Sequence, residues 1–197
     1  RFAQETLDGK IEIILGDILS FSISSHKLAS NSYKLVGAIP YYITGKLFRT
    51  FLELPEQPKT IAFIIQKEVA ERIIAKDGKE SLISLGVKAF GKPKYVRTVP
   101  RQFFSPPPKV SSALLVVENI SHSLFESGLK EQWLFKLLRA GFAHKRKVLA
   151  SSIREGLDME KDTLLSVFRE CGIGEKARPE DLSLESWACL GKNLKNQ

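Results

Sequence analysis

A proline followed by two tyrosines ends an apolar stretch in the first quarter of the chain. Residues 35–39 are apolar, and Pro40, Tyr41 and Tyr42 follow them. Proline cannot donate a ladder hydrogen bond and disfavours a helix at Ile39, so a strand must end there. Ligands bind at the carboxyl edge of open α/β sheets. The pattern predicts a ligand site that contains Tyr41 or, alternatively, a buried strand and a turn whose tyrosines only pack.

A second aromatic segment stands between two further predicted strands. Phe103 and Phe104 precede three prolines, residues 106–108, and then Lys109. Prolines stiffen the chain, so a loop here can hold aromatic rings outward at a small cost in conformational entropy. A loop phenylalanine can instead cover the core, and we expect that role for Phe103.

Basic residues are frequent in this chain, and some of them are clustered. The formal net charge is +8 and the sequence pI is about 9.5, which suits a polyanionic partner without requiring one. Lys145, Arg146 and Lys147 follow His144 directly after an apolar helical pattern. This cluster is a candidate phosphate-binding stripe or, alternatively, an ordinary solvated helix face.

Several separate segments, in the same order along the chain, resemble the rRNA adenine dimethyltransferases of the KsgA type. In that family Asn and then Leu or Ile precede the Pro-Tyr pair, and the tetrapeptide here is Ala38-Ile39-Pro40-Tyr41. The resemblance covers residues from about Ile11 to Leu190. It also includes Gln66–Arg72, Phe104–Ser112, Phe142–Lys147 and Arg178–Ser183.

This resemblance implies roles for individual residues. In the family, the target adenine stacks on the residues matched by Tyr41 and Phe104, and the carbonyl matched by Pro40 holds the adenine amino group. Ala38 stands where the family has the asparagine that also holds this group, so the geometry of attack is half specified. The implied catalytic set is therefore Ala38, Pro40, Tyr41 and Phe104. The implied RNA-binding set is Lys109, Lys145, Arg146 and Lys147.

The methyl donor that the resemblance implies is S-adenosyl-L-methionine. Asp17 matches an acidic residue that accepts a hydrogen bond from the cofactor's adenine amino group, with Ile18 along that adenine and Ala38 bordering the pocket. Taken without the family, Asp17 opens a turn or caps a helical turn. The family's glycine-rich cofactor loop has no counterpart in the sequence. We therefore expect a methyltransferase domain that is incomplete at its amino end.

The implied fold class is α/β, with the later strands of a Rossmann-like class I methyltransferase sheet in residues 1–118. A small all-α domain that binds rRNA would follow in residues 119–197. Residues 11–15 would either detach or pair directly with the strand at 35–39. Apolar residues at helical spacing predict helices around 47–52 and 133–142, and the apolar run 60–66 predicts a strand buried on both faces. The last two predicted strands, at 95–100 and 113–117, form an antiparallel pair.

The implied function is dimethylation of N6 of two adjacent adenines in small-subunit rRNA during ribosome biogenesis. Two alternatives stay open: a non-catalytic rRNA-binding or ribosome-assembly factor, favoured by Ala38, and a macrolide-resistance type 23S rRNA adenine methylase. The partner would be small-subunit rRNA in a particle of the pre-30S type. We expect a cytoplasmic monomer with no membrane span and no metal site, in which Cys171 and Cys189 are reduced packing residues.

Overall fold

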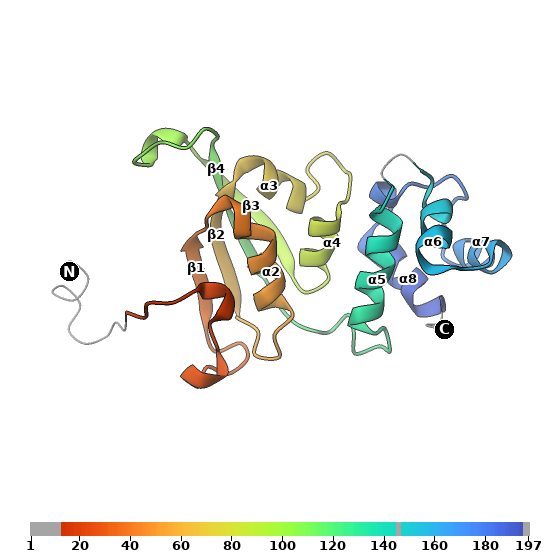
Figure 1. The fold of residues 1–197 in the computed structure, drawn as a ribbon, viewed down its shortest axis with the longest axis horizontal. Helices are drawn as coiled ribbons and strands as arrows, with labels where there is room; N and C mark the ends of the chain where they lie inside the picture. Colours follow the sequence, from red (N-terminus) through yellow and green to blue (C-terminus); the bar gives the residue numbers. More distant parts are fainter. Residues whose placement is uncertain (1–12, 145–146, 195–197) are drawn as a thin grey trace.

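A computed structural model describes residues 13–144 and 147–194 of the chain (Figure 1). Its centre is a mixed four-stranded sheet in the order β1-β2-β4-β3. Strand β1 (Lys34–Ala38) pairs in parallel with β2 (Thr60–Gln66), and β4 (Ser112–Glu118) is antiparallel to both β2 and β3 (Lys92–Val99). The carboxyl ends of β1, β2 and β3 therefore meet at one edge, where β4 begins. The antiparallel pair predicted near residues 95–117 is confirmed.

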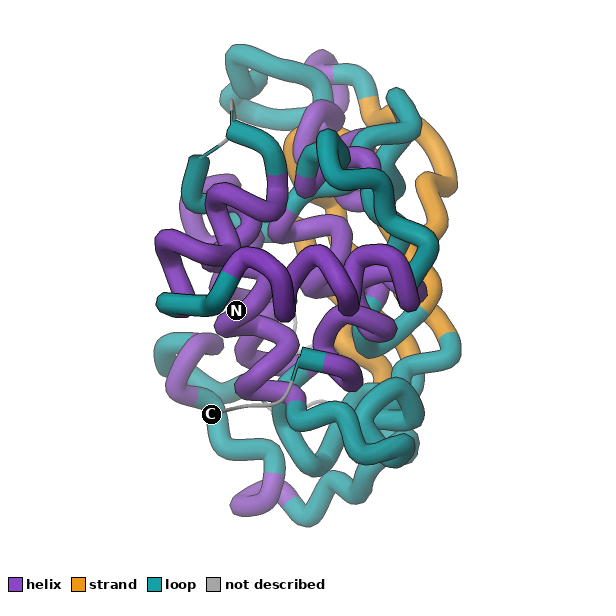
Figure 2. Tube along the Cα trace, turned by 90° about the vertical axis from the view of Figure 1, so that its right-hand side faces the viewer, coloured by secondary structure: helices purple, strands orange, loops and turns teal. Residues whose placement is uncertain are grey.

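Helices cover one face of this sheet. They are α2 (Thr44–Leu52), α3 (Lys67–Ile73) and α4 (Leu82–Lys88), and Figure 2 shows the strands along one side of the molecule with helices on the other. The apolar stripe predicted on α2 is confirmed, because its residues Leu47, Phe48, Phe51 and Leu52 are all buried.

The other face of the sheet is only partly covered. Alternate residues of β2 are buried, whereas Ala62 and Ile64 between them are partly exposed. On β1, Val36 is 73% exposed. The prediction of burial on both faces of β2 is therefore wrong, because within the described ranges no helix lies on this second face.

The strand predicted at residues 11–15 does not form in its described part. Residues 11 and 12 lie outside the described residues, and residues 13–15 have no strand structure, with Leu15 fully exposed. Of the two expected outcomes, the described part follows the first and detaches from β1. Two short 3-10 helices follow, η1 (Ile18–Ser20) and η2 (Ser24–His26).

The second half of the chain is helical, as predicted. It contains α5 (Glu131–Phe142), α6 (Leu149–Leu157), α7 (Lys161–Glu170), η5 (Pro179–Asp181) and α8 (Leu184–Asn193). Its centre is Trp187, which is fully buried and stacks on Phe142 with ring centroids 5.8 Å apart. A glycine is required nearby, because a Cβ at Gly141 would lie 2.3 Å from the Trp187 ring.

The helical half packs directly against the sheet half. The Phe90 ring after α4 stacks on Phe135 of α5, with centroids 6.0 Å apart. The backbone N–H of Glu80 donates a 2.8 Å hydrogen bond to the carbonyl of Glu180. Buried side chains of both halves belong to one continuous hydrophobic cluster.

The two cysteines form a disulfide, so the expectation that they are reduced is wrong. Cys171 follows α7 and Cys189 lies on α8, and the sulfur atoms are bonded. The physical reason is the packing of α7 against α8, which places the two Cα atoms 5.8 Å apart, within the normal range for a disulfide. The sequence separation of 18 residues gave no sign of this proximity.

Candidate catalytic edge of the sheet

The carboxyl end of β1 is built as the Pro40 pattern predicts. The N–H of Ile39 still donates to the carbonyl of Ile64 at 3.0 Å, and the ladder ends at Pro40. The chain then turns into a 3-10 helix, η3 (Tyr41–Ile43), in which the N–H of Ile43 donates to the Pro40 carbonyl at 3.1 Å. A carbonyl oxygen has two lone pairs, so Pro40 keeps one acceptor position.

Tyr41 is fixed by a hydrogen bond across the sheet edge. Its hydroxyl lies 2.9 Å from the Ser112 hydroxyl, and Ser112 is fully buried as the first residue of β4. Ser112 is paired with Gln66 at the end of β2. Tyr41 is therefore hydrogen-bonded to the residue at which the loop of Phe103 and Phe104 joins β4.

The loop between β3 and β4 extends beyond this edge (Figure 1, green segment). It contains a 3-10 helix, η4 (Arg101–Phe103), followed by Phe104 in an extended conformation. Phe103 is 72% exposed, and neither Phe103 nor Phe104 belongs to the described hydrophobic cluster. The expectation that Phe103 covers the core is wrong, because η4 turns its side chain to solvent. Phe104 is half-buried.

Ala38 is the last residue of β1 and is exposed. It pairs with Ile64 and lies on the partly covered face of the sheet, beside the start of η3. Its methyl group can neither donate nor accept a hydrogen bond. The position predicted to orient an adenine amino group thus lies at the site, but its side chain lacks the required chemistry.

Asp17 and Ile18, the two other residues predicted to bind the cofactor, lie at the start of η1, before β1. Asp17 caps η1, where its carboxylate accepts a 2.9 Å hydrogen bond from the N–H of Leu19. This is the turn-capping alternative. Helix η1 packs against α2, and Ile18 is partly exposed. A carboxylate suits an adenine amino group, and the Asp17 carboxylate keeps acceptor positions beyond its bond from Leu19.

The predicted RNA-binding residues have three different outcomes. Lys109 is exposed in the loop that carries Phe104. Lys145 and Arg146 lie outside the described residues. Lys147 precedes α6 and forms a 2.8 Å ion pair with Glu155, which also lies 3.4 Å from His144. The hydrogen bond from the Lys147 ammonium, with the charges of Lys147 and His144, lowers the pKa of Glu155.

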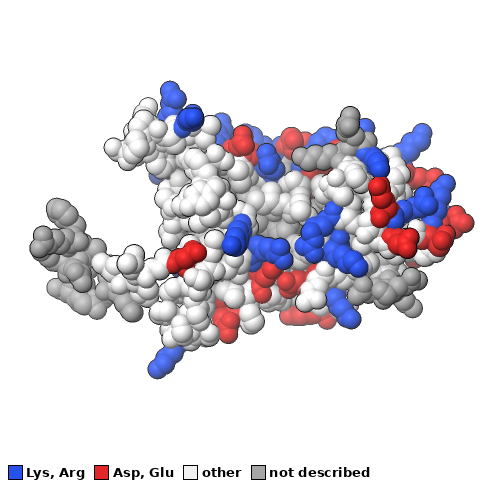
Figure 3. Space-filling view, in the orientation of Figure 1, with Lys and Arg blue, Asp and Glu red and all other residues white. Residues whose placement is uncertain are grey.

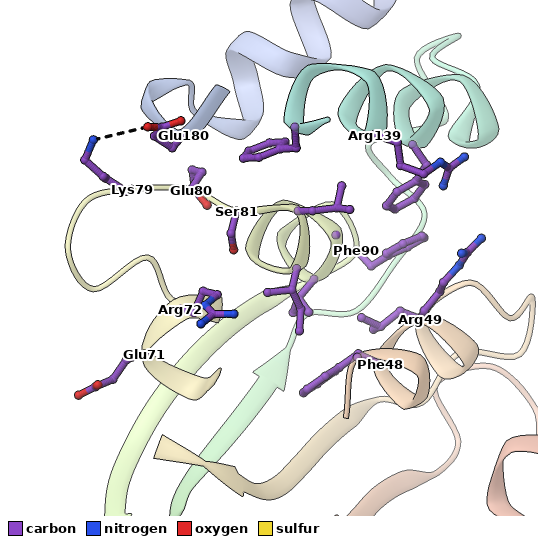
Figure 4. Close-up of a pocket in the computed structure, with 18 of the residues that line it drawn as sticks. Phe48, Arg49, Glu71, Arg72, Lys79, Glu80, Ser81, Phe90, Arg139 and Glu180 are labelled. Carbon is purple, nitrogen blue, oxygen red and sulfur yellow. Dashed lines mark ion pairs between the residues drawn. The ribbon is translucent and has the colours of Figure 1, made fainter. Parts of the chain in front are cut away.

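A groove of about 1230 Å³, which the sequence analysis missed, lies between α2 to α4 and α5 (Figure 4). Phe48, Phe90 and Phe135 line it, and Arg49 and Arg139 reach it from opposite walls. Figure 3 shows cations gathered over this region with acidic side chains beside them, and Arg49 is paired with Glu53 at 2.9 Å. In the sequence, this groove was signalled only by the polar residues of two amphipathic helices that lie far apart along the chain.

The described part of the chain contains neither a metal-binding cluster nor a helix that could span a membrane. Within residues 13–144 and 147–194 there is no group of three or more His, Cys, Asp or Glu side chains that could hold a metal ion. No helix in that part of the chain is both long and apolar enough to cross a membrane.

The chain is similar to known ribosomal RNA methyltransferases. The family model described as ribosomal RNA adenine dimethylase matches residues 1–196. A "Ribosomal RNA small subunit methyltransferase A" of Dehalococcoides mccartyi is 39% identical over 90% of this chain and 61% of its own length. A protein of the same name from Fusobacterium nucleatum is 30% identical, over 91% of this chain and 67% of its own length. The chain thus spans about six tenths to two thirds of these two relatives.

Two solved structures share the fold. A dimethyladenosine transferase from Plasmodium falciparum aligns with a TM-score of 0.76 at 24% identity, over 95% of this chain and 73% of that one. The 23S rRNA methyltransferase ErmE aligns with a TM-score of 0.64 at 21% identity, over 93% and 71%. The mixed sheet with its helices is therefore a Rossmann-like methyltransferase fold, as predicted.

Proposed function

Because this chain belongs to the ribosomal RNA adenine dimethylase family, we propose that it takes part in dimethylating N6 of two adjacent adenines in small-subunit rRNA. The proposed methyl donor is S-adenosyl-L-methionine, and the proposed partner is rRNA in a pre-30S type particle in the cytoplasm, bound by a monomer. The small-subunit choice is supported by the names of the relatives from Dehalococcoides and Fusobacterium. The observation that carries the proposal is the hydrogen bond between the hydroxyls of Tyr41 and Ser112. Ser112 lies directly after the Phe104 loop.

In this proposal, Tyr41 and Phe104 enclose a base that has left its stack. Enzymes that modify a base must expose it, and aromatic side chains then replace the lost stacking. The hydrogen bond between Tyr41 and Ser112 restricts the tyrosine ring before the base arrives. Less conformational entropy is therefore lost when the base binds. Phe104 is outside the core cluster, so its loop can adjust without disturbing the core.

Pro40 and position 38 would orient the amino group of that base. The Pro40 carbonyl uses one acceptor position for Ile43 and offers the other to the amino group. Ala38 offers nothing, so one of the two contacts that would align the nitrogen is absent. Alignment of this kind accounts for much of the rate in reactions without a covalent intermediate. We therefore expect weak methyl transfer from the chain with Ala38.

The remaining contacts would hold the RNA by its phosphates. We assign Lys109 to the backbone near the target base, and Lys145, Arg146 and Lys147 to a second segment of the RNA. In this assignment residues 1–118 carry the methyltransferase fold and residues 119–197 form the RNA-binding helical domain. Lys147 must exchange its ion pair with Glu155 for a phosphate.

A second candidate function is a non-catalytic rRNA-binding or ribosome-assembly factor. The specific observation in its favour is the methyl group of Ala38 at the catalytic position. A macrolide-resistance type activity on 23S rRNA is less well supported, because the two relatives compared above carry small-subunit names.

Calorimetric titration with S-adenosylmethionine, together with methyl transfer to under-methylated small ribosomal subunits, tests the proposal. The chain and its Ala38→Asn variant are compared. We expect transfer to rise at least tenfold in the variant, because the amino group gains its second acceptor. Binding of RNA without cofactor binding or transfer in either protein would instead support the non-catalytic function.

A further inference from the structure

Strand β3 lies at the centre of a basic part of the chain that has no acidic residues. Residues 81–117 contain six Lys and Arg residues and no Asp or Glu. Four of the six are exposed on or directly after β3: Lys92, Lys94, Arg97 and Arg101. The segment leads into the loop of Phe104 and Lys109.

A β-bulge places two of these cations on the same face of the sheet. Lys94 pairs with Val116, and the register then shifts so that Arg97 pairs with Leu114. Without the shift, Val96 would occupy the position opposite Leu114. Directly paired residues lie on the same side of an antiparallel pair, and alternate residues of a strand share a face. The bulge therefore substitutes Arg97 for Val96 in the row that starts at Lys94.

This row lies on the face of the sheet that the described helices leave open. Val116 and Leu114 pair in turn with Ala62 and Ile64 of β2, the partly exposed residues of that face. The residues opposite Lys94 and Arg97 are thus apolar and cannot neutralise them. Lys92 differs, because it is paired with Glu118.

The two cations have no acidic partner within the part of the chain that the structure describes. Neither Lys94 nor Arg97 takes part in any ion pair there, whereas Arg49, Arg72, Lys79 and Lys147 all do. A competing explanation is that charged side chains on an edge strand prevent edge-to-edge aggregation. That explanation predicts no effect on RNA binding.

We propose that Lys94 and Arg97 bind consecutive phosphates of the RNA strand that delivers its base to the Phe104 loop. This inference rests on the proposed function and adds a phosphate-binding row on β3 to it. The charge is complementary and unneutralised, and the strand runs directly into Arg101 and the loop. Alternate residues of a strand are about 6.8 Å apart, so the row can follow an extended RNA backbone.

The test measures the affinity of a labelled, short single-stranded RNA with two adjacent adenines, at several salt concentrations between about 50 and 200 mM. The variant is Lys94→Gln with Arg97→Gln in the full 197-residue chain. Each phosphate contact on a single strand contributes about 0.7 to the slope of log affinity against log salt. We expect the slope to fall by about 1.4 and the affinity at low salt to fall roughly tenfold.

The matched control is Lys34→Gln with Lys59→Gln. It removes the same charge from exposed residues at and beside the opposite edge of the sheet. A second variant, Lys94→Arg with Arg97→Lys, keeps the charge and should keep the affinity. The inference is overturned if the Gln variant binds like the control, if it only aggregates more readily, or if the charge-keeping variant loses as much affinity. Absence of salt-dependent RNA binding by the unmodified chain would overturn the proposed rRNA substrate itself.

Discussion

The hydroxyl of Tyr41 lies 2.9 Å from the hydroxyl of Ser112, which joins residues 71 positions apart at one edge of the sheet. Tyr41 directly follows Pro40, where the β1 ladder stops, and Ser112 begins β4 after the loop of Phe104. We expect Tyr41→Phe to destabilise the fold by about 1 kcal/mol, because it leaves the buried Ser112 hydroxyl without this partner. Denaturant unfolding of Tyr41→Phe, Ser112→Ala and the double variant measures this loss. Because the two side chains share this hydrogen bond, the two single effects should sum to clearly more than the effect of the double variant, and strict additivity would contradict the bond.

Phe104 should contribute to RNA binding more than its neighbour. Replacing it with alanine should weaken binding of a single-stranded, adenine-containing RNA by about 1–3 kcal/mol, the usual value for one stacked base. Phe103→Ala is the matched control, since both rings lie outside the core cluster and neither change should affect unfolding. Fluorescence anisotropy with the same RNA compares the two. Equal losses would show that the loop binds RNA without a specific stacking position.

Two helix glycines should respond in opposite ways to alanine. A Cβ at Gly141 would lie 2.3 Å from the Trp187 ring and 2.9 Å from Leu149, so Gly141→Ala should destabilise by about 1–3 kcal/mol. At Gly86 in α4, the nearest atom would be 3.6 Å away on Phe135. Gly86→Ala should therefore stabilise by about 0.5–1 kcal/mol, because alanine loses less backbone freedom on folding. Thermal or denaturant unfolding of both variants gives the sign directly.

The phenol of Tyr33 should ionise at a higher pH than an ordinary tyrosine. Burial, with the negative charge of Glu56, raises its pKa from 10.0 to about 12, and its hydroxyl donates a 2.7 Å hydrogen bond to the Glu56 carbonyl. The folded protein favours the neutral phenol. This contribution to stability is therefore complete below pH 10 and is lost as the pH rises through about 12. Ultraviolet titration of tyrosinate should show a transition near pH 12 that disappears in Tyr33→Phe.

Glu155 should titrate early while Lys147 is present. Its pKa is lowered first by the hydrogen bond from Lys147, so its contribution is present at neutral pH and is lost as the pH falls through the lowered value. NMR titration of the carboxyl carbon should show a rise of the pKa in Lys147→Gln and no change in Lys161→Gln, an exposed lysine on α7. RNA binding should also raise the Glu155 pKa if a phosphate replaces Glu155 as the partner of Lys147.

Local sequence patterns predicted the elements around the candidate catalytic edge because the relevant causes are local. Pro40 ends β1 through its missing N–H, and the spacing of Leu47, Phe48, Phe51 and Leu52 determines the buried face of α2. In α3, Glu68 and Arg72 pair across one helical turn at 4.0 Å. Each of these features depends on residues only a few positions apart.

The features that sequence analysis missed depend on distant segments. The Cys171 and Cys189 disulfide, the groove between α2 and α5, and the bond from Tyr41 to Ser112 all require the packed fold. A strand is expected at residues 11–15, but its described part, residues 13–15, has no strand structure, because propensity is insufficient without a neighbouring strand that pairs with it. The position of Arg97 opposite Leu114 depends on a β-bulge that no residue type in this strand predicted.

The contact between the two halves of the molecule has a consequence for the shape of the RNA. The stacked rings of Phe90 and Phe135, the backbone bond from Glu80 to Glu180 and the shared hydrophobic cluster hold the sheet and the helices as one body. The edge at Tyr41 and the segment around Lys147 are therefore a constant distance apart. An RNA that reaches both must already be folded with its two contact segments at that distance. In the proposed function, the protein would therefore select its substrate by architecture, and a short strand with the right bases would satisfy only half of the requirement.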